Sequence, residues 1–322
     1  MRQTRTLLPR LLIIIVFLWA CSHNKSKTLK PQGYESENVL TVESGDLKAV
    51  FVDNSEIAPD HRAGYNGIAQ LYHAQQDSGI FVPAYAGFNL EHIFGGDTLA
   101  QLFEPRLHGM QLYRKSEHEV LLYQAPTPIS SVESLTSFKV VNPHYIDVNF
   151  ECILHNTAFF SHHYAGLFWA SYIANPPDKR IYFQGSSEKG SDSIRWIAAW
   201  SGKHGDSSTH KSVNDNHDFY FADNFNARLA SHFSTYRYTE PYFFGRYKGM
   251  VLAFLLDGGR EVIRFSQSPD GGGKLNPAWD FQYLIPSPEP RKIYSFKARI
   301  IYKPFVSDND IAEEYRRWKG NK

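Results

Sequence analysis

Cysteine is nearly absent from the chain: Cys21 and Cys152 are the only two in 322 residues. The familiar catalytic signatures are missing as well, since no CxxC pair, HExxH helix, GxSxG elbow or glycine-rich phosphate loop occurs. These absences exclude a disulfide-rich scaffold and a zinc ribbon, as well as an HExxH metalloprotease and a P-loop nucleotide enzyme.

An excess of charge of one sign is also lacking. Lys and Arg number 34 against 33 Asp and Glu, which leaves a net charge of +1 and no block of like charge. A nucleic-acid partner is therefore not expected. Adjacent His162 and His163 would face opposite sides of a strand, and the His204, His210 and His217 loop fits no metal-ligand spacing, so we expect no metal and no cofactor.

Long apolar runs are limited to one, Leu11–Ala20, which is too short to span a bilayer. Three arginines precede it and a polar, cationic stretch follows Cys21. This is the pattern of a secretory signal, so residues 1–20 are predicted to be a signal peptide.

The cleavage site Leu18-Trp19-Ala20-Cys21 resembles the bacterial lipobox. The resemblance implies acylation of Cys21, palmitate-like chains that anchor the protein to a membrane, and a place in the cell envelope on the periplasmic or outer-membrane side. An ordinary cleaved signal followed by an incidental cysteine is the alternative. Cys152 then has no partner and is expected to be a small buried hydrophobe.

What the chain does have is aromatic residues, at 15%, and short β-prone runs divided by turn residues. Residues 21–38 are polar and predict a flexible tether. Residues 39–306 predict one large antiparallel β domain, and residues 307–322 carry a C-terminal helix over Asp308–Lys319 with Ser307 or Asp308 as its cap. Nothing indicates an oligomer, so a monomer is expected.

The expected strands are spread along the whole domain. They cover residues 39–43, 47–53, 110–113, 120–123, 138–141, 145–153, 167–173, 180–184, 194–200, 250–257, 260–266, 281–285 and 293–303. A short helix is expected within 66–75. Residues 186–249 are rich in Ser, His, Asn and Gly and predict long loops with a helical turn near Asp223–His232.

Five segments mix charge, aromatics and Gly or Pro without periodicity. They are residues 85–92, 102–106 with His108, 166–172, 236–241, and 264–280. Charged side chains in apolar settings are costly unless paired. These segments therefore either hold structural ion pairs or form a site.

The stretch 281–302, with its Pro288-Glu289 turn and the strand Lys292-Ile-Tyr-Ser-Phe-Lys-Ala-Arg299, resembles the close of a galactose-mutarotase-like β-supersandwich. The five segments resemble an uncharacterised group of secreted bacterial proteins with that presumed fold. The resemblance covers about residues 40–306. It implies an all-β supersandwich and a sugar-facing sheet, as in aldose epimerases, polysaccharide lyases and parts of glycoside hydrolases.

The resemblance also implies roles for candidate residues. The predicted catalytic residues are His92, Glu240, Asp280 and Arg106. The predicted substrate-binding residues are Glu91, Glu104, His108, Trp169, Tyr236, Arg237, Gln267 and Trp279. A carboxylate and a histidine would exchange protons, an arginine would bind a uronate or an oxyanion, and the tryptophans would stack on pyranose rings.

The sequence thus predicts a lipid-anchored carbohydrate-active protein with lyase, hydrolase or epimerase chemistry on a poly- or oligosaccharide. A non-catalytic glycan-binding lipoprotein and an envelope scaffold are the alternatives. The carbohydrate hypothesis makes a structural prediction. The five segments should line one concave face with Trp169 or Trp279 exposed, and Arg106 and Arg237 should point into the same void.

Overall fold

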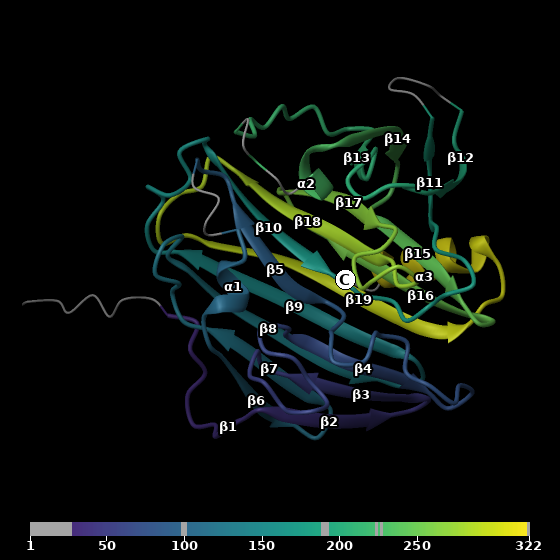
Figure 1. Cartoon of the computed structure of the whole chain (residues 1–322), viewed down its shortest axis with the longest axis horizontal. Coiled ribbons are helices and arrows are strands. Elements are labelled where there is room, and N and C mark those ends of the chain that lie inside the picture. The colour runs from purple at the N-terminus through teal and green to yellow at the C-terminus, as the bar shows by residue number, and fades with distance from the viewer. Residues whose placement is uncertain (1–27, 98–101, 188–192, 223–224, 226–227, 321–322) are drawn as a thin grey trace, which may run out of the picture.

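The structure is a computed structural model that describes residues 28–97, 102–187, 193–222, 225 and 228–320 (Figure 1). The predicted signal peptide and Cys21 lie outside the described residues. None of the helices in the described part of the chain is long and apolar enough to cross a membrane.

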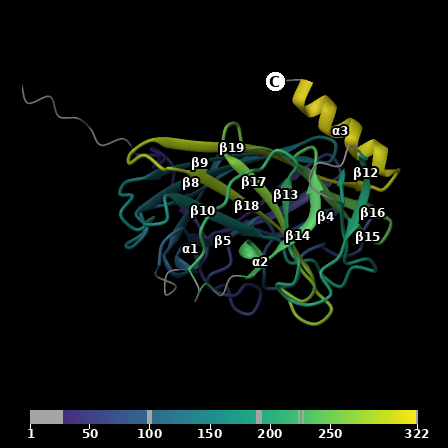
Figure 2. The same cartoon turned by 90° about the horizontal axis from the view of Figure 1, so that it is seen from above.

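The main sheet has sixteen strands, of which fifteen follow one another along a single hydrogen-bonded path that curls into two layers (Figures 1 and 2). The first layer runs in the order β1 (Ser36–Glu37), β6 (Met110–Ser116), β7 (Glu119–Gln124), β8 (Val132–Val141), β9 (Tyr145–Leu154), β19 (Ile293–Pro304), β16 (Met250–Asp257), β15 (Tyr242–Tyr247) and β11 (Ile181–Ser186). The path continues through β14 (Phe233–Tyr238), β13 (Thr209–Ser212), β17 (Val262–Ser268), β18 (Ala278–Pro286), β10 (Tyr164–Ala170) and β5 (Asn89–Phe94).

The remaining elements complete these layers. β12 (Arg195–Ala199) pairs with β11, and β2 (Val39–Ser44), β3 (Leu47–Val52) and β4 (Gly67–His73) form a separate small sheet. Only β13 and β14 pair in parallel among the described strands. The helices are α1 (Glu104–Leu107), α2 (Arg228–Ser231) and α3 (Asp308–Gly320). The predicted large antiparallel β-sandwich with a C-terminal helix is confirmed.

One aromatic core lies between the layers. Trp169 stacks on Phe281 with ring centroids 5.1 Å apart, and Phe296 meets Trp169 edge-on at 5.0 Å. These side chains come from β10, β18 and β19, so the core joins the two layers. Offset and edge-to-face contacts of this kind stabilise a core beyond the area they bury.

The C-terminal helix begins as predicted. The Asp310 N–H donates to Ser307 Oγ at 3.1 Å, which makes Ser307 the cap. The apolar side of α3 buries Ile311, Tyr315 and Trp318 against the first layer. Figure 2 shows α3 and the start of the described chain on one side of the molecule, with α1 and α2 on the opposite side.

Three predictions about local structure were wrong. The helix expected within 66–75 is strand β4, because residues 67–73 pair along β3 and bury Ile68 and Leu71 in the core. The long loops expected over 186–249 contain β13, β14 and β15, whereas β12 matches the strand expected at 194–200 and α2 matches the expected helical turn. Their polar composition hides strands whose side chains satisfy backbone groups, as where Thr209 Oγ1 donates to the Leu229 carbonyl at 2.6 Å.

The third wrong prediction concerns residues 28–38, the described part of the segment that was expected to be a flexible tether. The Glu133 carboxylate accepts hydrogen bonds from the Thr28 hydroxyl and, at 3.0 Å, from the Leu29 N–H. Leu29 packs on a small apolar cluster that includes Tyr113, Leu121 and Tyr123. The chain is therefore fastened to the first layer from Thr28 onward.

Candidate functional site

A cavity of about 250 Å³ opens on the outer face of β5, β10 and β18. Its lining includes Phe103, which precedes α1, and Leu229 of α2. Figure 2 shows both helices on the side of the molecule away from α3. Its lining combines apolar groups with two carboxyls and two histidines. The lining residues are Glu91, His92, Leu102, Phe103, Ala170, Tyr172, His204, Leu229, Gly271, Ala278 and Asp280.

An irregularity in the strand pairing brings Glu91 and His92 to the same cavity. Along the β5–β10 ladder, His92 pairs with Phe168 and Leu90 pairs with Trp169, so Glu91 has no partner residue of its own. Successive side chains of a regular strand point to opposite faces, whereas a bulge re-aims one of them. The bulge thus lets both side chains leave the core and line one cavity.

Glu91 is the most heavily bonded of the acidic groups there. Its Oε1 accepts from Arg106 Nη1 at 2.9 Å and from the Tyr172 hydroxyl at 2.6 Å, while its Oε2 lies 3.8 Å from His92 Nε2. The Arg106 guanidinium also lies 4.0 Å from the centre of the Tyr65 ring. A charge-assisted bond and a stacked guanidinium fix the carboxylate in position.

Asp280, unlike Glu91, is a fully buried carboxyl with few hydrogen-bond partners. One oxygen accepts the Ser171 N–H at 3.1 Å, and the other has no hydrogen-bond partner among the described residues. Burial raises the pKa of Asp280 well above its usual range, and the Glu91 charge raises it further. Asp280 therefore holds its proton to a higher pH than an ordinary aspartic acid does.

His92 lies between the rings of Phe103 and Phe168, with centroids at 4.5 and 5.2 Å. Burial lowers the pKa of His92, although Glu91 opposes the effect. The imidazole is therefore neutral near pH 7, and its Nδ1 has no hydrogen-bond partner within the described part of the chain.

The cavity thus combines three groups that can exchange protons: the Glu91 carboxyl held by Arg106, the Asp280 carboxyl with its raised pKa and the His92 imidazole with its lowered pKa. Buried groups with perturbed pKa values in one cavity mark a candidate acid–base site. The described lining contains no lysine or arginine. No group of three or more His, Cys, Asp or Glu within the described ranges is placed to hold a metal ion.

Of the residues predicted for a site, the structure brings Glu91, His92 and Asp280 together, with Arg106 behind Glu91. The prediction that Trp169 or Trp279 is exposed is wrong, since their exposed fractions are 1% and 0%. Both residues alternate with cavity residues along their strands, so their side chains fall on the core face. They cannot stack on a sugar in this structure.

The prediction that Arg106 and Arg237 point into the same void is also wrong. Arg237 donates to the Ser212 and Asp215 carbonyls at 3.0 and 3.2 Å, in a loop that is not part of the cavity. Glu240 lines a different concavity, near the turn that connects β16 to β17.

The other predicted binding residues hold the structure together. Glu104 accepts the N–H groups of Ile129 and Ser130 at 2.7 and 3.1 Å. The His108 carbonyl accepts from two side-chain amides. Buried Gln267 and half-buried Tyr236 both lie near His210 rather than in the cavity. The five segments therefore do not line one face.

Sequence reasoning gave no role to Tyr172 or Phe103. Tyr172 follows Phe168 and Ala170 at the two-residue spacing of one strand face, which is a signal that could have identified it. Phe103 is 43% exposed beside His92, and an exposed phenylalanine of this kind has no signature in a sequence.

Comparison with known proteins gives only distant structural likenesses. No protein-family model matches the chain, and no curated protein matches it. Among solved structures, a candidate aldose 1-epimerase from Escherichia coli K12 aligns over 85% of this chain and 100% of its own, at 11% identity and a TM-score of 0.44.

Two lyase structures align as well. A mutant heparan sulfate lyase from Pedobacter heparinus aligns over 88% of this chain at 11% identity and a TM-score of 0.42. A heparinase III aligns over 86% at 7% identity and a TM-score of 0.44. This chain covers only 37% and 36% of those two proteins. The assignment of the site rests on the geometry of the cavity.

Proposed function

We propose that the chain is a carbohydrate-active protein whose cavity performs acid–base chemistry of the epimerase type on a neutral sugar. The observation that carries the proposal is the meeting of Asp280, Glu91 and His92 in one cavity. Asp280 is a buried carboxyl with one oxygen free of any partner in the described structure, and it faces a second carboxylate that is fixed by Arg106 and Tyr172.

The proposed roles follow from the bonding of Glu91 and from the raised pKa of Asp280 and the lowered pKa of His92. Asp280 donates a proton to the ring oxygen of the sugar, and Glu91 accepts the proton of the anomeric hydroxyl. The bond between the anomeric carbon and the ring oxygen breaks, which leaves a carbonyl at that carbon. Rotation and the reverse proton transfers then close the ring as the other anomer. Neutral His92 can accept or pass on a proton beside Glu91.

The cavity also limits the substrate. Its volume of about 250 Å³ is below the range of about 300–1,000 Å³ that is usual for ligand pockets, which favours a single sugar ring. Two carboxyls and the lack of a lysine or arginine in the described lining disfavour an acidic sugar. The exposed ring of Phe103 offers an apolar face on which a pyranose can rest.

The protein is further proposed to be a lipoprotein of the cell envelope, monomeric and anchored through acyl groups on Cys21. The support is the apolar run that ends at Leu18-Trp19-Ala20-Cys21. Mass spectrometry of the membrane fraction tests this proposal. An unmodified Cys21 on a soluble protein would contradict it.

The catalytic proposal is tested with the mature chain and a panel of neutral aldoses, by polarimetry after dissolving a single anomer. We expect faster anomer interconversion with the wild type and a large loss with Asp280→Asn. Glu240→Gln is the matched control, because Glu240 is an exposed carboxylate outside the cavity. If the sugars raise the melting temperature without any rate effect, the protein is a glycan-binding module. If neither changes, the cavity is not a sugar site.

A further inference from the structure

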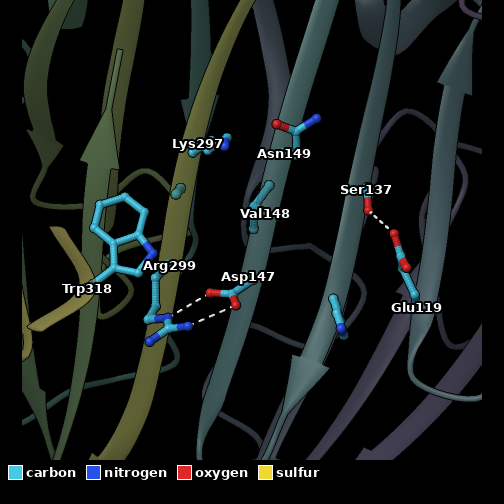
Figure 3. Close-up of a pocket in the computed structure, with 10 residues that line it drawn as sticks. Glu119, Ser137, Asp147, Val148, Asn149, Lys297, Arg299 and Trp318 are labelled. Atoms are coloured by element: carbon cyan, nitrogen blue, oxygen red, sulfur yellow. Dashed lines mark hydrogen bonds and ion pairs between the residues drawn. The ribbon is translucent and has the colours of Figure 1, made fainter. Parts of the chain in front are cut away.

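Another concavity, of about 360 Å³, lies on the other side of the sandwich, on the outer face of β7, β8, β9 and β19 (Figure 3). We call it the outer groove. Its lining is mostly polar and charged, and Trp318 of α3 stands at its edge. The lining residues are Glu119, Ser137, Lys139, Asp147, Val148, Asn149, Lys297, Ala298, Arg299 and Trp318.

The strand register arranges these side chains in two rows across the sheet. One row pairs Glu119 with Lys139, Lys139 with Asp147, and Asp147 with Arg299. The second row pairs Ser137 with Asn149 and Asn149 with Lys297. Residues directly opposite one another across strands share a face, so both rows belong to the floor of the outer groove.

The two carboxylates of the floor are already paired. Asp147 makes a two-pronged ion pair with Arg299, at 2.6 and 2.8 Å, and that guanidinium lies 4.6 Å from the Tyr145 ring centre. Glu119 accepts from Lys115 at 2.7 Å. It also accepts from Ser137 at 2.7 Å (Figure 3). Both carboxylates of the floor therefore already have partners within the protein.

Two exposed lysines of the outer groove, Lys139 and Lys297, are available to bind a ligand. Lys297 makes no side-chain hydrogen bond or ion pair with the rest of the described chain, and Lys139 has only a through-space interaction with Glu119. Their strands are separated by β9, so the two backbones lie about 10 Å apart across the sheet. Asn149 lies between them and adds an amide that can donate and accept.

We propose that the outer groove is a binding site for an anionic saccharide, one that carries carboxylate or sulfate groups. The anionic groups meet Lys139 and Lys297, and the hydroxyls meet Asn149 and Ser137, with Trp318 as the wall. A flat bilayer surface does not fit as well, because the lining residues enclose a concavity of about 360 Å³ beside Trp318 of α3. This site is separate from the proposed catalytic cavity, which lies on the opposite face and has no cation in its described lining.

The test is calorimetric titration of the mature chain with a sulfated, uronate-containing tetrasaccharide prepared from heparin. Binding should weaken as salt rises, and Lys139→Ala with Lys297→Ala should lower the affinity about tenfold or more. Lys48→Ala with Lys274→Ala is the matched control, since it removes two exposed lysines outside the groove. The control should bind as the wild type does.

Three outcomes would overturn the proposal. They are an equal loss in the control pair, equal binding of an uncharged maltotetraose, and binding only to vesicles that contain anionic lipid. Asp280→Asn should leave this binding unchanged, so failure of the outer groove and failure of the catalytic cavity are distinguishable.

Discussion

Replacing Asp280 with Asn changes one polar atom of a fully buried side chain. The amide oxygen can still accept the Ser171 N–H, which lies 3.1 Å from Asp280 Oδ1. The new NH₂ group occupies the position of the protonated oxygen. The variant therefore mimics the protonated acid without the ability to give up its proton. Loss of a general acid costs about 10²–10⁴-fold in rate, and we expect a loss of this size in the anomer assay.

The same substitution should stabilise the folded protein. Because the pKa of Asp280 is raised in the folded state, the folded chain binds this proton more tightly than the unfolded chain. Below about pH 3.9, the ordinary pKa of an aspartic acid, Asp280 is protonated in both the folded and the unfolded chain, so its ionisation does not change the free energy of unfolding. Above that pH only the folded state keeps it, so the free energy of unfolding falls by about 1.4 kcal/mol per pH unit until the folded pKa is reached.

Urea unfolding followed by tryptophan fluorescence between pH 4 and 8 measures this difference. Asp280→Asn should match the wild type near pH 4 and become progressively more stable as the pH rises. Asp77→Asn, at an exposed position, should follow the wild type throughout. If the free energy of unfolding depends on pH in the same way in the wild type and in Asp280→Asn, the raised pKa of Asp280 is refuted. If Asp280→Asn interconverts the anomers at the wild-type rate, the role of Asp280 as the general acid is refuted.

Three further variants test contacts of the fold. Arg106→Met leaves the Glu91 carboxylate without its cation and should lower the free energy of unfolding by about 3–5 kcal/mol, whereas exposed Arg114→Met should not. Trp169→Ala should cost about 3–5 kcal/mol because the ring is in the core, and Trp200→Ala, at 44% exposure, should stay within about 0.5 kcal/mol. Glu133→Ala should expose the N-terminal segment to trypsin at low enzyme concentration; an unchanged cleavage pattern would contradict the docking at Thr28.

The sequence was sufficient to predict the class of fold, because alternation and turn residues are local signals. The hairpin of β8 and β9 around Asn142-Pro143 and the helix after Ser307 have the predicted turn and cap. Strands β13 and β14 within 186–249 were missed because they are short and polar, and their pairing depends on residues far away in the chain.

The site was harder to predict because its geometry depends on pairing that no local pattern records. Glu91 and His92 share the cavity only through a bulge that forms against β10. Aromatic content marked Trp169 and Trp279 as possible sugar platforms, but which face of a strand meets the core is settled by the neighbouring layer. Phe103 precedes the short helix α1, and its exposure follows from how that helix packs beside β5.

The central claim is that the cavity of Glu91, His92 and Asp280 receives a neutral sugar ring, and a crystal structure of the mature chain soaked with a neutral hexose tests it most directly. The account predicts one ring in the cavity, its ring oxygen or anomeric hydroxyl within about 3.2 Å of Asp280 and Glu91, resting on Phe103. A cavity that stays empty at saturating sugar, or a hexose bound elsewhere, would contradict the account.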